Sequence, residues 1–549
     1  MTAALSRATL PGGTLTIDGV CGPAAIGQTL FDCAEALGVT VPTSCVKQGK
    51  CRECLVEIES GAALLSAPAP QESHLDGRFR LACRTAVVEP GEVRAHTLKR
   101  GSLRIETETD GLEAMPSLEP AVTRDGSFVR LDGQPLAEAS GPLHGLAVDV
   151  GTTTVALRLY DLESGALLAT QSFENPQRFG GSDIMARIHY DGTHKGRLLQ
   201  RTLLGYLSRA IASLPVDTAT IYELVVAGNP TMRDLFFGLD VQPIGVMPYR
   251  STTEAALHEG RATTTSLSLR ARKLRLPVHP EARVYGLPLV GSHVGADAAA
   301  CLLATGLAEG DELCALLDIG TNTEAFLGNR HRLLAASCPA GPAFEGGGVT
   351  FGMPALDGAI ERVRLRDDGS LAVHSIGAAA PVGICGSGLV DLLSELRRTG
   401  RMNEQGRLGD DGDRIILDQA HGLSVSEADV NELAQAKGAN AAGLRVLADA
   451  YGIDMGRIDR LYLAGGFARH LDVDAACRIG LVPDLPRERI VKVGNAALLG
   501  ASIALLSRRR RADLEAMVKR VEHVRLEAHP PFFEFFVEGC QFAPFGSAA

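Results

Sequence analysis

The chain has 549 residues, which is more than a single compact domain usually holds, so we expect several domains. A formal net charge of −11 argues against a nucleic-acid-binding surface, and a hydrophobic content of 45% supplies ample material for large cores. No targeting segment is visible, and no apolar run is long enough to span a bilayer. We therefore expect a cytoplasmic protein whose partners include neither nucleic acid nor a membrane.

The first predicted elements lie on either side of a cysteine-rich loop. Residues 13–19 alternate between apolar and polar types and predict a strand that leads into a turn. Residues 29–38 predict a helix that ends at a glycine, and residues 55–61 predict a second strand. Cys33 falls on the apolar side of the helix, so we expect it in the core.

The loop contributes three cysteines, and a fourth follows after 28 residues; the four are Cys45, Cys51, Cys54 and Cys83. Two iron atoms bridged by two sulfides need four thiolates. The spacing C-x5-C-x2-C resembles that of the [2Fe-2S] ferredoxins, whose plant-type loop reads C-x4-C-x2-C. The longer first gap is similar to that of vertebrate-type and bacterial hydroxylating ferredoxins. The motif therefore predicts a [2Fe-2S] cluster that carries one electron at a time.

A structural zinc ion on the same four cysteines is the main alternative. Zinc sites of this kind usually use two C-x2-C pairs, and this segment holds one, so the cluster is favoured. Disulfides are less favoured still, because nothing marks the chain for secretion and cytosolic thiols stay reduced.

Residues 101–142 are rich in charge and turn residues, with only short apolar runs such as 128–131. We interpret them as a linker or a reduced middle segment, with room for a small hairpin.

A repeat follows this segment. Residues 146–159 read as an apolar strand that ends at Asp149, a Gly-Thr-Thr turn and an alternating strand. The same phrase returns at 316–325, and five of eight positions are identical between 149–156 and 318–325. Two chance hairpins are the alternative, but the shared order Asp-x-Gly-Thr-x-Thr argues against them. We expect two related lobes, which start near residues 143 and 312.

Each lobe also has a helix rich in small residues. Residues 291–303 precede the second hairpin, and residues 494–504 occupy a similar place near the end of the chain. Glycine and alanine on one face allow two helices to cross closely. The two lobes would then face each other across a cleft.

The chemistry of the two turns is that of phosphate binding. Glycine lets the backbone approach an anion, and threonine hydroxyls add donors. A carboxylate at the strand end can hold Mg²⁺ directly or through water. A third strand, 461–464, ends in a bare Gly-Gly that leaves room for a purine and ribose. The residues concerned are Asp149, Gly151, Thr152, Thr153, Asp318, Gly320, Thr321, Asn322, Gly465 and Gly466.

This order of elements, over residues 143–510, resembles the actin/sugar-kinase/heat-shock-chaperone ATPase superfamily. The resemblance implies a two-lobed α/β, actin-like ATPase domain of the ribonuclease H-like type that binds ATP and Mg²⁺. The whole chain is then a multi-domain protein: an α+β, β-grasp [2Fe-2S] ferredoxin domain at 1–100, the segment 101–142, and the ATPase domain at 143–549.

Further phrases narrow the resemblance; they stand at 175–183, 227–232, 339–346 and 383–389. Together with the N-terminal cluster motif, they make the chain similar to the reductive activators of corrinoid proteins. That family uses ATP to restore Co(I) in corrinoid-dependent methyltransferase systems. The resemblance implies a corrinoid protein and an upstream electron donor as partners, and a homodimer is compatible with it.

The resemblance also implies roles for the repeated turns. Asp149 and Asp318 would be catalytic and position Mg²⁺ and water, while the threonines and Asn322 would hold phosphates. Glu324 and Glu345 are further candidates to orient a water, although each could equally be a solvated or ion-paired residue. Gly341, Gly386 and Gly388 are candidates for the pocket lining, with ordinary turns as the alternative.

Two other functions remain open. One is a kinase with a fused redox-sensing ferredoxin domain, in which a small molecule accepts the γ-phosphate. The other is an electron-transfer subunit whose ATPase fold binds nucleotide without hydrolysing it.

Overall fold

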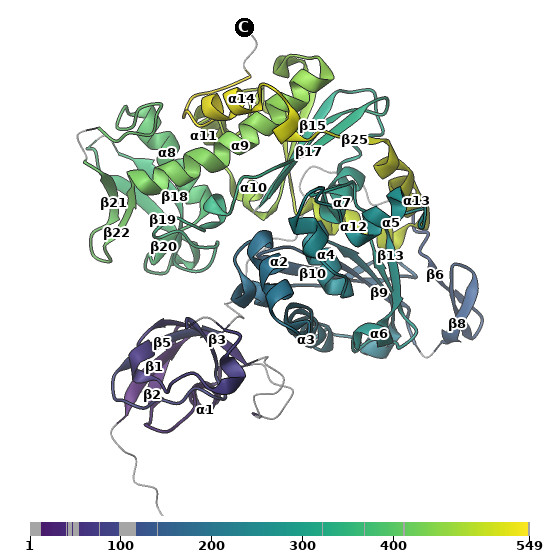
Figure 1. Cartoon of the computed structure of the whole chain (residues 1–549), viewed down its shortest axis with the longest axis horizontal. Coiled ribbons are helices and arrows are strands. Elements are labelled where there is room, and N and C mark those ends of the chain that lie inside the picture. The colour runs from purple at the N-terminus through teal and green to yellow at the C-terminus, as the bar shows by residue number, and fades with distance from the viewer. Residues whose placement is uncertain are drawn as a thin grey trace, which may run out of the picture. The chain divides into compact units, whose positions relative to one another are not determined.

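The structure is a computed structural model that describes residues 12–39, 41, 47, 54–75, 77–97, 117–139, 141–320, 322–366, 368–409 and 412–546. Cys45, Cys51 and Thr321 lie outside the described residues. The described parts of Met1–Ser102 and Phe173–Ser213 form one compact unit, and those of Leu103–Ser172 and Leu214–Ala549 form another. Figure 1 labels the helices and strands of the chain.

The first unit is built on a mixed five-stranded sheet of order β2-β1-β5-β3-β4. Strands β1 and β5 are parallel, and the other neighbours are antiparallel. Helix α1 begins after the cap Thr29, whose hydroxyl oxygen accepts from the Asp32 amide at 3.1 Å, and it contacts β1 and β2. The elements are β1 (Gly13–Ile17), β2 (Val20–Ala24), α1 (Leu30–Ala36), β3 (Leu55–Ser60), β4 (Phe79–Leu81) and β5 (Glu92–Thr97).

The expected strands and helix of this region are confirmed, and Cys33 is buried in the core as predicted. A sheet of this order with one helix packed on it is the β-grasp ferredoxin architecture. The unit also includes the turn η3 (Pro176–Gly180) and the helices α2 (Ile184–Thr193) and α3 (Leu198–Ala212).

The second unit contains two six-stranded sheets with a common core order. The first runs β11-β10-β9-β12-β14-β13 and the second runs β25-β17-β16-β15-β23-β24. The strands of the first are β9 (His144–Val150), β10 (Thr154–Asp161), β11 (Leu167–Glu174), β12 (Ile221–Ala227), β13 (Leu267–Arg270) and β14 (Arg283–Gly286). Those of the second are β15 (Cys314–Ile319), β16 (Thr323–Gly328), β17 (Leu333–Cys338), β23 (Arg460–Ala464), β24 (Ile490–Gly494) and β25 (Val521–His523).

The two sheets repeat in register as well as in order. In each, a hairpin is extended by a parallel strand, and the last residue of that strand pairs with the aspartate of the hairpin. Ala227 of β12 pairs with Asp149, and Ala464 of β23 pairs with Asp318. The repeat predicted from the sequence is therefore present in the fold, and it brings both aspartates to the carboxyl ends of parallel strands.

Helices cover these sheets, and smaller sheets complete the second lobe. The helices are α4 (Pro230–Phe237), α5 (Thr252–His258), α6 (Ala271–Leu274), α7 (Ala296–Thr305), α8 (Gly386–Arg398), α9 (Glu427–Tyr451), α10 (Gly466–His470), α11 (Val473–Arg478), α12 (Ala496–Leu506), α13 (Arg508–Met517) and α14 (Phe532–Gly539). The small sheets are formed by β18 (Ala359–Leu365), β19 (Leu371–Ser375) and β20 (Gly383–Ile384), and by β21 (Arg414–Asp418) and β22 (Leu423–Ser426).

Helices α7 and α12 pack closely against each other, as their small residues predict. At the crossing, a methyl group on Gly500 would lie 1.9 Å from the Ala300 carbonyl oxygen, so only glycine fits there. Helix α7 begins at Ala296, later than the sequence indicates, because residues 291–294 form a tight bridge instead.

Residues 122–138 form a small antiparallel sheet of β6 (Val122–Asp125), β7 (Phe128–Leu131) and β8 (Gln134–Glu138). Val122 and Val129 are fully buried in the same core as α7 and α12. This part of the segment 101–142 is therefore a three-stranded sheet packed on the second unit, with one strand more than the hairpin anticipated there.

Within the part of the chain that the structure describes, every helix is too short or too polar to cross a membrane.

Candidate functional site

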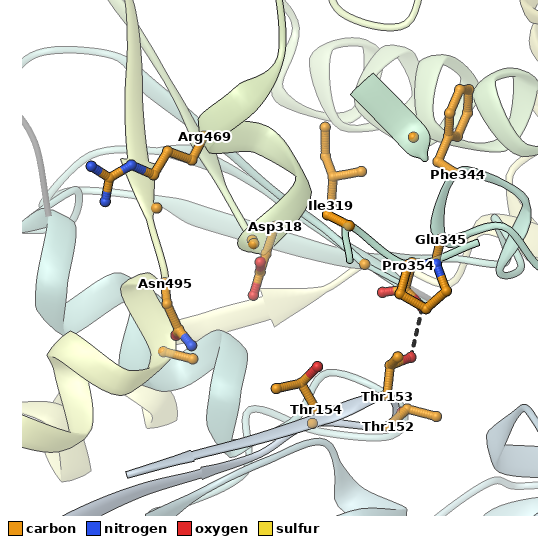
Figure 2. Close-up of a pocket in the computed structure, with 18 of the residues that line it drawn as sticks. Thr152, Thr153, Thr154, Asp318, Ile319, Phe344, Glu345, Pro354, Arg469 and Asn495 are labelled. Atoms are coloured by element: carbon orange, nitrogen blue, oxygen red, sulfur yellow. Dashed lines mark hydrogen bonds between the residues drawn. The ribbon is translucent and has the colours of Figure 1, made fainter. Parts of the chain in front are cut away.

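One pocket of the second unit is lined by both repeated turns. Asp318, Ile319 and Glu345 face Thr152, Thr153 and Thr154 across it (Figure 2). Nine of the residues singled out from the repeats and the Gly-Gly strand end line it: Asp149, Gly151, Thr152, Thr153, Asp318, Gly320, Asn322, Gly465 and Gly466. Of the further candidates, Glu324, Glu345 and Gly386 also line the pocket, whereas Gly341 and Gly388 are not among its described lining residues.

The first turn, residues 151–153, is closed by a hydrogen bond from the Gly151 amide to the Thr154 carbonyl oxygen at 2.9 Å. Two polar side chains from other parts of the second unit form hydrogen bonds with this turn. The Asn229 amide group donates to Thr152 Oγ1 at 3.0 Å. Thr153 Oγ1 donates to Glu345 Oε2 at 2.9 Å, which joins this turn to the second lobe (Figure 2).

The strand ends that carry the aspartates need glycine beside them. Gly465 has a φ of +99°, and a Cβ there would lie 2.3 Å from the Ile319 carbonyl oxygen. Its counterpart Gly228 has a φ of +156°, and a Cβ there would lie 2.9 Å from the Val150 carbonyl oxygen. Glycine therefore permits the close approach of the backbones on both sides of the repeat.

Five carboxyl groups line the pocket: Asp149, Asp297, Asp318, Glu324 and Glu345. Burial raises the pKa of Asp149 to about 7, although a hydrogen bond from Asn495 at 3.0 Å opposes the rise. Burial, together with the charge of Asp318, raises the pKa of Asp297 to about 8. Burial also raises the pKa of Asp318 and of Glu324 above the usual range.

This cluster fits a bound cation. Buried carboxylates repel one another, and a divalent cation among them would lower every one of these pKa values. Glu324 Oε1 is buried without a hydrogen-bond partner among the described residues. Within those residues no three acidic, histidine or cysteine side chains converge closely enough to hold a metal alone. A cation here would need oxygen atoms of water or of a ligand to complete its coordination. Mg²⁺ is usually bound in this way, by a few protein carboxylates together with water and substrate phosphates.

Asn229, Asp297 and Asn495 are among the pocket-lining side chains that sequence reasoning missed. Asn229 and Asn495 each follow a strand and cap the next helix. A search for capping residues directly after the apolar strands would have found both. Asp297 stands in the first turn of a helix of small residues, where its carboxyl group gave no separate signal.

The cysteine pair of the first unit also has the geometry of a metal site. Cys54 directly precedes β3 and Cys83 follows β4, which pair so that Leu55 lies opposite Leu81. Both cysteines are buried, and their sulfur atoms are 3.2 Å apart. This distance is too long for a disulfide of about 2.05 Å. Two sulfurs on one tetrahedral metal, each bound at about 2.3 Å, lie about 3.8 Å apart, so a small separation of the two side chains would let the pair share one metal ion.

Comparisons with known protein families cover almost all of the chain. A model described as the 2Fe-2S iron-sulfur cluster binding domain matches residues 16–88. The RACo middle region matches residues 144–310, and the C-terminal domain of RACo, the ASKHA domain, matches residues 312–547. The chain belongs to the RACo family. Its fold is a ferredoxin domain followed by an ASKHA, that is actin/sugar-kinase-like, domain.

Individual proteins that are similar to this chain agree with this. The corrinoid activation enzyme RamQ of Eubacterium limosum is 29% identical over 93% of this chain and 95% of its own length. The [Co(II) methylated amine-specific corrinoid protein] reductase of Methanosarcina barkeri is 25% identical over 72% of this chain and 76% of its own. A solved structure named reductive activator for corrinoid, iron-sulfur protein superposes with a TM-score of 0.68 and 29% identity, covering 97% of this chain and 98% of its own.

Proposed function

We propose that this chain is an ATP-dependent reductive activator of a corrinoid protein. One electron passes from a [2Fe-2S] cluster to Co(II), which becomes Co(I) as the cluster is oxidised. The observation that carries the proposal is the joint lining of one acidic pocket by both Asp-x-Gly-Thr turns, in a RACo-family chain that also has the Cys54–Cys83 pair. Cys45 and Cys51 are the other two proposed ligands of the cluster.

In this proposal the pocket binds ATP with Mg²⁺. Asp149 and Asp318 position the cation and the attacking water, because they end equivalent strands and face the same space. Backbone amides and hydroxyl groups of the two turns bind the phosphates, which are anionic and suit such donors. Thr152, Thr153, Asn322 and Thr321 supply these side chains, and the backbone at Gly151 and Gly320 stays close to the phosphates. Gly465 and Gly466 leave room for the adenosine.

ATP is needed because the electron moves uphill. A plant-type cluster has a potential near −400 mV. An acceptor lower by ~200 mV would cost about 4.6 kcal/mol per electron. Nucleotide binding can offset this cost only if it favours one arrangement of the two lobes. We propose that ATP favours the closed arrangement, that this form docks the Co(II) corrinoid protein, and that hydrolysis releases it.

The proposal extends to the organisation of the chain. We assign residues 1–100 to the ferredoxin-type domain, 101–142 to a connecting segment and 143–549 to the ATPase domain. A separate protein would reduce the cluster, and a homodimer is compatible with this arrangement. A cytoplasmic location, away from nucleic acid and membranes, suits a protein whose cysteines must remain reduced thiolates.

The decisive experiment mixes the reduced, cluster-loaded protein with a Co(II) corrinoid protein and follows the Co(I) absorbance with and without ATP. We expect Co(I) to accumulate only when ATP is present. If no corrinoid partner gives an ATP-dependent Co(I) signal, the proposal is wrong. Turnover of ATP with a small-molecule acceptor and no protein partner would instead indicate a kinase.

A further inference from the structure

Asn495 makes two hydrogen bonds that point in different directions. Its side-chain oxygen accepts from the Leu498 amide at 2.8 Å and so caps α12. Its side-chain nitrogen donates to Asp149 Oδ2 at 3.0 Å. Because the oxygen must face the helix amide, the nitrogen is directed at the carboxylate. Asn495 directly follows β24 of the second sheet, so it joins the end of that strand and the start of α12 to the strand-end aspartate of the first sheet.

The side-chain oxygen and nitrogen of Asn229 also have different partners. Its oxygen accepts from the Met232 amide at 2.9 Å and caps α4, while its nitrogen donates to Thr152 Oγ1 at 3.0 Å. The Thr152 oxygen therefore acts as an acceptor on this side. Its own hydroxyl hydrogen is left to donate to another acceptor, such as a phosphate oxygen in the pocket that Thr152 lines.

A capping role alone explains only one bond of each residue. An N-cap oxygen typically stabilises a helix by about 1 kcal/mol, and serine or aspartate serves nearly as well as asparagine. Aspartate has no hydrogen to donate, and the shorter serine side chain carries its single hydroxyl hydrogen at a different place from the amide nitrogen. The requirement for asparagine thus lies in the second bond, whose acceptors, Asp149 and Thr152, both belong to the pocket.

We propose that Asn495 and Asn229 are positioning residues that set Asp149 and Thr152 in the orientation that binds the nucleotide. The inference rests on the proposed function of the pocket. Each asparagine ties a helix start to the first strand–turn unit; Asn495 follows β24 of the second sheet, and Asn229 follows β12 of the first. Neither residue needs to touch the nucleotide to act in this way.

The test compares the full-length protein with variants that keep the cap and remove the amide donor. These are Asn495→Ser and Asn229→Ser, with Asn495→Ala and Asn229→Ala as variants that lose both bonds. Ser251→Ala is the matched control, because Ser251 caps α5, away from the pocket lining. The measurements are Tm, the Kd for a non-hydrolysable ATP analogue with Mg²⁺, and the KM and kcat of ATP hydrolysis.

We expect both serine variants to keep a Tm at or above that of the Ser251→Ala control. Asn495→Ser should bind the analogue about tenfold to a hundredfold more weakly, because its lost bond ends on a carboxylate. In Asn229→Ser, Kd and KM should each rise by about threefold to tenfold. The effect is smaller because the lost hydrogen bond is between neutral groups. The alanine variants should lose Tm in addition, and the control should bind as the wild type does.

Serine variants that bind the analogue as tightly as the wild type would overturn the inference and leave only the capping role. If a serine variant does not fold, Asn229→Asp and Asn495→Asp decide, since aspartate caps a helix but cannot donate. Unchanged binding by these variants would again overturn it. A wild-type protein that fails to bind the analogue would overturn the proposed function as well, so the two failures are distinguishable.

Discussion

At the scale of single residues, the carboxyl groups of the pocket lower the free energy of unfolding of the ligand-free protein. It gathers the buried Glu324 and the half-buried Asp149, Asp297 and Asp318 around one space, and each has a pKa above its usual range. Groups of this kind cluster at functional sites because the ligand, and not the folded protein alone, satisfies them. The stability of the ligand-free protein should therefore depend on the pH range in which these carboxyl groups titrate.

Asp297→Asn tests this cost. The pKa of Asp297 is about 8 in the folded state and about 3.9 in an unfolded chain. Between these values the unfolded chain has released the proton and the folded chain has not, so raising the pH favours unfolding. We expect the Tm of the variant, relative to the ligand-free wild type, to rise from pH 5 to pH 8. Asp240→Asn, at an exposed site, should show no such trend, and a constant difference for Asp297→Asn would contradict the prediction.

At the scale of elements, the fold depends on how closely helices approach. Helices α7 and α12 cross at Gly500 and Ala300, and each carries a pocket residue in or just before its first turn, Asp297 and Asn495. The crossing therefore sets the positions of two pocket residues that are far apart in the sequence. Helix α14 depends instead on a buried lysine, because Lys437 of α9 donates to the carbonyl groups at its end.

Gly500→Ala should destabilise the protein, although glycine to alanine inside a helix normally stabilises by about 1 kcal/mol. The new methyl group would lie 1.9 Å from backbone oxygen and 2.5 Å from backbone carbon of Ala300, which cannot rotate away. We expect a loss of about 1–3 kcal/mol in the free energy of unfolding, measured with urea. Gly310→Ala is the control, since its nearest neighbour atom is 3.9 Å away. A stabilised Gly500→Ala variant would show that the helices can separate freely.

Lys437→Met should matter more at high pH than at low pH. Lys437 is 1% exposed, its Nζ donates to the Gln541 carbonyl oxygen at 2.6 Å, and burial lowers its pKa to about 7. Above pH 7 the folded protein no longer holds this proton, whereas an unfolded lysine keeps it until about pH 10.4, so wild-type stability rises across this range. The difference in Tm between wild type and variant should therefore be larger at pH 9.5 than at pH 6.5. Lys273→Met, at an exposed site on α6, should give an equal difference at both values.

At the scale of the whole molecule, the chain joins two chemistries that can be separated by substitution. Cys54 and Cys83, two of the proposed cluster ligands, belong to the first unit, and the acidic pocket belongs entirely to the second unit. Each unit has its own core, so a change in one site should leave the other site formed. Electron delivery and nucleotide use should then fail independently, although activation of the partner needs both.

Cys83→Ser and Asp318→Asn form the matched pair for this test. Cys83→Ser removes one thiolate, so we expect loss of the visible cluster absorbance and of Co(I) formation, with binding of the ATP analogue retained. Asp318→Asn should keep the cluster absorbance and lose at least about tenfold of the ATP-dependent Co(I) rate, because a charge-assisted interaction with the cation is removed. Loss of nucleotide binding in Cys83→Ser would contradict the independence of the two sites.

The sequence by itself determined the features that depend on residues close together in the chain. Each of the two copies of Asp-x-Gly-Thr-x-Thr lies within one hairpin, so it is local in the sequence. The shared motif and the alternating strand residues around it identified both copies as a repeat. The small residues of two helices likewise indicated their close crossing. Such patterns are readable because a strand or helix repeats its face every few residues.

Only the tertiary structure decided which distant side chains meet at the site. Asn495 and Asp149 are 346 positions apart, and Thr153 and Glu345 are 192 positions apart, yet each pair is hydrogen-bonded. No periodicity of the chain encodes such a pair, because the contact depends on how two complete lobes pack. Asp297 entered the acidic cluster for the same reason: the approach of α7 to the second sheet placed its carboxyl group beside Asp318.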